Sequence, residues 1–183
     1  VDRTKRTVEL SFGNSGRAAA VFHVRASDGA GGAWSYTVGP GADLKDSFPA
    51  TGTAYSFAVY GPNGFYRMFS GDIDGSAVEV EVDAIVAVTH SGGGVASAGI
   101  ILMLRNAGES LQTLTIRDGY TRRTETVSVA AGTTERKDCP LEQSFGWYDL
   151  LVEAEGDADF RRRFAGHVET GLDSMTDPAM AKA

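Results

Sequence analysis

Two arginines occupy the same pattern, Phe-x-Arg-x-Phe-x-Gly, at residues 65–71 and again at residues 160–166. A guanidinium group binds phosphate and carboxylate well, so Arg67 and Arg162 could form anion sites if their heads reach solvent. In a strand, however, the arginine and both phenylalanines lie on one face. We therefore predict buried phenylalanines, with each guanidinium on an Asp or on backbone carbonyls. The recurrence of the pattern favours this structural role.

The spacing of the other reactive side chains does not match a known catalytic or metal site. Residues 72–75, Asp-Ile-Asp-Gly, begin like a calcium loop, but the further oxygen ligands and the Glu at position twelve are missing, so a turn is favoured. His23, His90 and His167 lack metal-ligand spacing. Residues 94–99 are one residue too long for a G-x-S-x-G nucleophile turn. We predict no catalytic residue, no metal site and no cofactor.

A possible lipid contact lies in the turn at residues 61–66, Gly-Pro-Asn-Gly-Phe-Tyr. Aromatic side chains at an exposed tip are suited to a membrane interface, and Tyr66 is the candidate because Phe65 should face the core. The favoured alternative is a tight turn ahead of a core strand. The later copy of this segment, residues 156–159, is acidic, which argues against lipid contact there.

Strands with period-two alternation must position these residues. Val8, Leu10 and Phe12 alternate with polar neighbours, and residues 78–83 and 127–129 behave in the same way. Turn signals such as Gly39-Pro40-Gly41 separate these runs at short intervals. No stretch has helical periodicity. The fold class predicted is all-β, with antiparallel sandwiches of the immunoglobulin-like type.

Landmarks recur in the same order about ninety residues apart, which is a domain-sized period. We predict two tandem β-sandwich domains related by internal duplication, at residues 1–75 and 76–183. Residues 77–88 form an extra strand ahead of the second copy, and the first copy has only residues 1–6 there. Its N-terminal strand is therefore expected to be missing or shortened. The glycine-rich residues 91–94 then form a hairpin loop inside the second copy.

Composition restricts the class of partner. The formal net charge is -7, and residues 77–183 carry the whole acidic excess, which disfavours nonspecific nucleic-acid binding. No apolar run approaches the ~20 residues of a membrane-spanning helix. Cys139 is the single cysteine, so no internal disulfide is possible, and it is expected to be a small half-buried filler.

Two longer stretches carry a resemblance to a known family. Residues 58–71, with Ala-Val-Tyr-Gly-Pro-Asn-Gly-Phe followed by Arg-x-Phe-x-Gly, resemble the C-terminal module of bacterial phosphocholine-preferring phospholipases C. So does the ending at residues 164–180. The resemblance implies a secreted or periplasmic parent that hydrolyses phosphatidylcholine or sphingomyelin, with a catalytic domain before two such modules. That catalytic domain is not in this sequence, so no active-site residue can be transferred to it.

Two functions follow from these observations. The first is a non-catalytic accessory region whose partner is the parent's own catalytic domain, or which helps the parent engage a phospholipid surface. The second is an independent adhesion or glycan-binding pair of domains. An apolar patch left exposed on one face would favour the first, and a shallow cleft lined by exposed aromatics would favour the second. We predict that this fragment is not itself an enzyme.

Overall fold

The computed structural model describes residues 1–27, 32–50, 52–90, 96–171 and 173–180, and it confirms the all-β prediction. These residues form thirteen strands and a single turn of 3₁₀ helix, η1 (Glu142–Ser144). None of them forms a helix that is long and apolar enough to cross a membrane. The predicted hairpin loop at residues 91–94 lies outside the described residues, although the strands on either side of it pair antiparallel from His90↔Ala96 onward.

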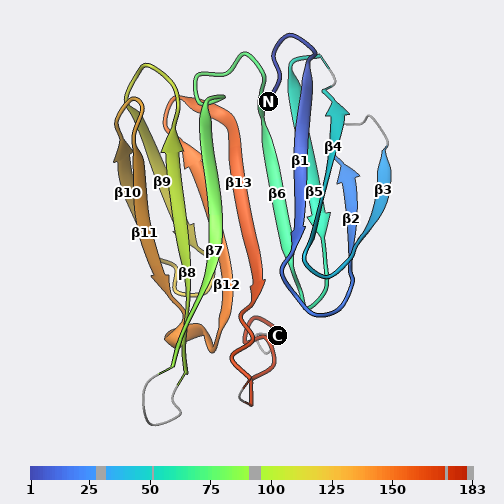
Figure 1. The fold of residues 1–183 in the computed structure, drawn as a ribbon. Coiled ribbons are helices and arrows are strands. Elements are labelled where there is room, and N and C mark those ends of the chain that lie inside the picture. Colours follow the sequence, from blue (N-terminus) through green and yellow to red (C-terminus); the bar gives the residue numbers. More distant parts are fainter. Residues whose placement is uncertain (28–31, 51, 91–95, 172, 181–183) are drawn as a thin grey trace.

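The first half of the chain packs a two-stranded sheet on a four-stranded layer (Figure 1). The small sheet pairs β1 (Thr7–Asn14) with β4 (Ala42–Pro49). The facing layer has the order β3 (Ala33–Val38), β2 (Ala20–Ala26), β5 (Ala54–Tyr60), β6 (Tyr66–Asp72).

The second half repeats this arrangement with an additional strand. A three-stranded sheet has the order β11 (Thr134–Pro140), β8 (Ala96–Asn106), β7 (Val80–His90). Its facing layer has the order β10 (Thr124–Val129), β9 (Gln112–Asp118), β12 (Trp147–Ala154), β13 (Asp157–His167). The similar strand orders agree with an internal duplication, but the duplication and the domain boundary at residues 75–76 stay predictions.

The two facing layers join into one continuous eight-stranded sheet, because β6 pairs antiparallel with β13. In this register Arg67 lies opposite Phe164, and Arg162 lies opposite Phe69. The two Phe-x-Arg-x-Phe-x-Gly patterns are therefore cross-strand neighbours at the centre of the molecule. Local sequence patterns do not indicate this pairing.

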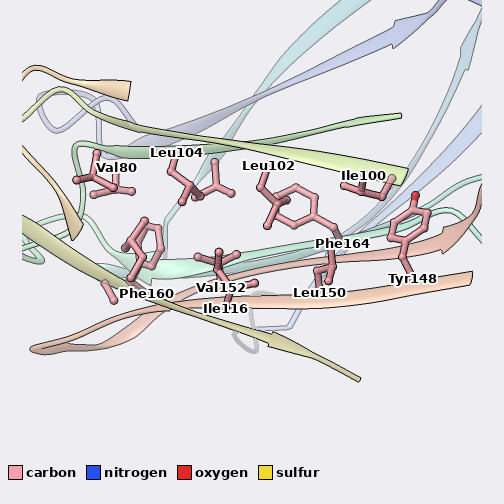
Figure 2. Close-up of a cluster of buried hydrophobic side chains, with 14 of the residues drawn as sticks. Val80, Ile100, Leu102, Leu104, Ile116, Tyr148, Leu150, Val152, Phe160 and Phe164 are labelled. Carbon is pink, nitrogen blue, oxygen red and sulfur yellow. The ribbon is translucent and has the colours of Figure 1, made fainter. Parts of the chain in front are cut away.

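Each half has its own hydrophobic core between its two layers. Figure 2 shows the core of the second half, where Val80, Leu102 and Leu104 lie above Val152 and Phe160. The first core is rich in aromatic rings, and Phe48 and Phe57 there are each 1% exposed. Full burial of such a side chain contributes about 1.5–3 kcal/mol to folding. Cys139 is half-buried against the second core, as predicted for a filler.

Candidate functional site

Arg67 connects the two halves of the chain through a buried guanidinium. Its side chain extends from β6 across to β13, where Nη1 donates to the carbonyl oxygen of Ala165 at 3.1 Å. Nη2 donates to the hydroxyl of Tyr148 at 3.1 Å. The guanidinium also lies over the Phe65 ring, 4.2 Å from its centroid. The residue is only 9% exposed, so its positive charge is held by protein groups.

Arg162 makes the reciprocal contacts from β13 into the first half. Nη1 donates to the carbonyl oxygen of Ser70, and Nη2 donates to the hydroxyl of Tyr55 at 2.7 Å. The guanidinium lies 4.2 Å from the centroid of Phe160, and the residue is 7% exposed. Its neighbours Arg161 and Arg163 point to the opposite, exposed face, so the three arginines do not form one basic patch, as predicted.

These contacts confirm that backbone carbonyls hold both guanidinium groups, and they add tyrosine hydroxyls that the sequence pattern does not indicate. The condition for an anion site, a solvent-exposed guanidinium, is not met.

The last member of the pattern is glycine because a tyrosine hydroxyl lies close to its backbone. A Cβ at Gly71 would lie 2.6 Å from the hydroxyl oxygen of Tyr55, and one at Gly166 would lie 2.8 Å from that of Tyr148. Glycine therefore leaves room for the tyrosine that meets the arginine.

A groove of about 460 Å³ runs above this central strand pair. Its walls are β1 on one side and β7 on the other, with β6 and β13 below, and Figure 1 shows β6 and β13 between the two walls. Phe65 and Phe69 are part of its lining and are only half-buried. At one end Arg3 bridges towards β7, with Nη2 3.7 Å from a carboxylate oxygen of Glu79.

Tyr66, the lipid-contact candidate, lies on the outer face of the eight-stranded sheet as the first residue of β6. The preceding turn is closed by a hydrogen bond from the Phe65 N–H to the Pro62 carbonyl at 3.1 Å. The Tyr66 ring packs against Tyr60, with centroids 5.2 Å apart, and Arg163 lies 5.9 Å from its centroid. Burial raises the pKa of Tyr66, and Tyr60 adds to the effect. The side chain is therefore half-covered by protein and does not project from a tip.

The outward face of the three-stranded sheet carries an apolar strip. Val82 and Leu102 point into the core, so Ile85 on β7 and its partner Ile101 on β8 point outward. Ile85 is 49% exposed, and Met103 lies along the same face. Beside the strip, burial and then the charge of Glu81 raise the pKa of Asp83.

The suspected calcium loop is a turn, as favoured from the sequence. The two carboxylate oxygens of Asp72 accept hydrogen bonds from the Asp74 N–H at 2.7 Å and from the Thr53 hydroxyl at 2.6 Å. The Thr53 bond, and then the Asp74 bond, lower the pKa of Asp72. In the described part of the chain no three His, Cys, Asp or Glu side chains gather as metal ligands.

One polar cluster was not anticipated from the sequence. The Ser174 hydroxyl lies 2.9 Å from Nε2 of His167, and Nδ1 of His167 lies 3.2 Å from a carboxylate oxygen of Glu169. Nε2 is also 3.2 Å from the carbonyl oxygen of Phe145. These contacts link the segment that carries Ser174 to β13 and to the residue after η1, so the arrangement suits attachment of the C-terminal segment. The indole N–H of Trp147, which donates to the Met175 carbonyl at 2.9 Å, attaches it as well.

Comparisons with known proteins match the whole chain to one family. The family described as "Bacterial phospholipase C, C-terminal domain" matches residues 1–72 and 77–167. The chain is 37% identical to a non-hemolytic phospholipase C of Burkholderia pseudomallei over 186 residues, which cover 100% of the chain and 26% of that relative. It is 34% identical to a non-hemolytic phospholipase C of Pseudomonas aeruginosa, over 94% of the chain and 25% of the relative. A hemolytic phospholipase C of Pseudomonas aeruginosa is 36% identical over 75% of the chain and 18% of its own length. The chain thus spans about a quarter or less of these relatives.

Proposed function

The chain belongs to the C-terminal domain family of bacterial phospholipases C, and from this premise we propose that it is a non-catalytic accessory region of a secreted phospholipase C. Its partner is the parent's own catalytic domain, which it stabilises. The substrate class of the parent is phosphatidylcholine or sphingomyelin.

The observation that carries this proposal is the apolar strip on the three-stranded sheet. Ile85 and Ile101 lie side by side on an outward face, and contiguous apolar side chains on the surface of a domain often mark a site of contact with another protein surface. The buried contacts of Arg67 and Arg162 cross the β6–β13 pair that joins both halves into one sheet, and they add rigidity there. A rigid support with an apolar strip on one face fits docking against a neighbouring domain.

Two alternatives receive less support. Glycan binding needs a cleft lined by exposed aromatics, whereas the phenylalanines of the groove are buried or half-buried and the exposed Tyr60 lies on the opposite face of the sheet. Direct lipid contact would rely on Tyr66, which packs on Tyr60 and Arg163.

The test compares the parent enzyme with its Ile85→Ser variant. We expect Ile85→Ser to lower the unfolding temperature of the parent's catalytic domain and to leave the isolated chain unchanged, because the side chain is exposed in the isolated chain. Val21→Ser is the matched control, since Val21 is 43% exposed on a different sheet face. Equal behaviour of the two variants in the parent would refute docking through this strip.

Activity separates the stabilising function from lipid targeting. A parent that lacks residues 1–183 of this chain should lose activity on a soluble phosphocholine ester and on phosphatidylcholine vesicles to the same degree. Loss on vesicles alone would establish lipid targeting in its place. The isolated chain should hydrolyse neither substrate, and turnover that a single substitution in it abolishes would overturn the accessory assignment.

A further inference from the structure

One edge of β1 faces the groove without a partner strand among the described residues. Hydrogen bonds show which residues point there: the Thr7 N–H donates to the Asp2 carbonyl at 3.1 Å, and the Asp2 N–H donates to the Thr7 carbonyl at 2.8 Å. On the opposite side, the Asn14 carbonyl accepts from the Gly41 N–H at 2.7 Å next to β4. Backbone groups alternate along a strand, so those of Glu9, Ser11 and Gly13 point away from β4 into the groove. A row of such groups is a template for another strand.

The second half shows what occupies the corresponding place there. Its additional strand β7 pairs with β8, and Val80 and Val82 of β7 belong to the core that buries Phe160 and Phe164 to 1% and 3% exposure. The matching phenylalanines of the first half, Phe65 and Phe69, stay half-buried and line the groove. The first half therefore lacks a covering strand over β6.

The start of the chain points into this position. Asp2 and Thr7 form a reciprocally hydrogen-bonded pair that closes a four-residue loop, in which Arg6 has a φ of 54°. This is the geometry at the end of an antiparallel hairpin. Val1 lies beyond the pair and already lines the groove.

We propose that the segment of the parent chain directly before Val1 forms a strand antiparallel to β1 and fills this groove. This inference rests on the proposed function in one respect, namely that the chain is part of a longer parent. The chain covers about a quarter of the length of two of its relatives. The segment is held by β-strand addition, with backbone hydrogen bonds to β1 and apolar side chains on the groove floor. The segment that leads from the rest of the parent into the accessory region is thereby held in the sheet of its first half.

The Asp2–Thr7 pair sets the register of the proposed strand. Counting outward from it, the residue before Val1 exchanges hydrogen bonds with Glu9, and the residue three positions before Val1 does so with Ser11. The residues two and four positions before Val1 lie opposite Leu10 and Phe12, whose side chains are buried. Opposite residues share a face in an antiparallel pair, so these two should be apolar and their neighbours polar.

Amide hydrogen exchange tests the inference by comparing the 1–183 chain with a protein that begins about ten natural residues earlier. In the longer protein, exchange at Glu9, Ser11 and Gly13 should slow by about tenfold or more, because a ladder hydrogen bond protects its amide until the strand opens. Amides of the outer edge strand β10 serve as the control and should not change. Equal exchange of the three amides in both proteins would overturn the proposal.

Substitution at two matched positions gives a second measurement. Phe69→Ala should shift the urea midpoint more in the longer protein than in the 1–183 chain, because the added strand buries Phe69. Phe164→Ala, already covered by the second core, should give the same shift in both proteins. An equal Phe69→Ala shift in the two proteins contradicts the inference.

The outcomes separate this inference from the proposed function and from other occupants. In one outcome the β1 amides are protected in the longer protein, while the Ile85→Ser and Val21→Ser parents have the same unfolding temperature. This outcome would support the added strand and refute docking through the apolar strip. If the β1 amides gain no protection but Ile85→Ser lowers the unfolding temperature of the parent, docking through the strip is supported and the added strand is refuted. If both proteins dimerise in sedimentation experiments and protect Glu9, Ser11 and Gly13 equally, a second copy occupies the groove and the inference fails.

Discussion

Replacing Tyr55 by phenylalanine tests whether the buried arginine contacts stabilise the joined sheet. Tyr55 is 2% exposed, and its hydroxyl accepts a hydrogen bond from Nη2 of Arg162 at 2.7 Å. Tyr55→Phe removes this acceptor without changing the ring, and it leaves one N–H of a buried guanidinium without a partner. A hydrogen bond to a charged group is worth about 1.5–3 kcal/mol, so we expect the free energy of unfolding to fall by that amount.

Thermal unfolding followed by circular dichroism is a suitable assay. For a chain of this size, 1 kcal/mol corresponds to roughly 2–4 °C, so Tyr55→Phe should lower the melting temperature by roughly 3–12 °C. Tyr148→Phe removes the longer contact with Arg67, at 3.1 Å, and its drop in melting temperature should lie in the lower half of that range. Tyr60→Phe, at an exposed tyrosine, is the control and should stay within about 0.5 kcal/mol of the wild type.

A double-mutant cycle isolates the contact itself. Tyr55→Phe and Arg162→Met, measured singly and together, should give a coupling energy of about 1.5–3 kcal/mol. If Tyr55→Phe costs no more than Tyr60→Phe, or if the coupling energy is near zero, the argument that these groups hold the two halves together is wrong.

Three further predictions concern individual side chains. In urea unfolding of the 1–183 chain, Phe164→Ala should lower the free energy of unfolding by about 3–5 kcal/mol. Phe69→Ala should lower it by only about 1–3 kcal/mol, because Phe69 is half-buried. Equal losses of free energy in the two variants would contradict this difference. Burial raises the pKa of Cys139 to about 11 from its ordinary 9.0, so at pH 8 iodoacetamide should alkylate the folded chain on the order of a hundredfold more slowly than the urea-unfolded chain. Similar alkylation rates would show that the thiol is open to solvent. Tyr66→Ser should not alter co-sedimentation with zwitterionic vesicles, and a loss of binding on that substitution would restore Tyr66 as a lipid contact.

Local sequence patterns predicted much of the fold because strands with one buried face alternate with period two. The runs around Val8 and Val80 alternate in this way, and both became strands in which Val8, Val80 and Val82 are buried. The same periodicity correctly placed Arg67 and Arg162 on the inward face of their strands. The missing ligand positions after Asp72 likewise favoured a turn over a calcium loop, and the structure has a turn there.

The sequence by itself therefore determined the fold class, the strands with clear period-two alternation and the need for a partner at each buried arginine. Only the tertiary structure decided which partner that is. The hydroxyl that Arg162 meets is 107 residues away in the chain, and the one that Arg67 meets is 81 residues away. Pairing of β6 with β13 brings these groups together, and any open strand edge offers the same backbone hydrogen bonds. The choice among edges depends on how whole side-chain faces fit together across the sheet, which no local pattern specifies.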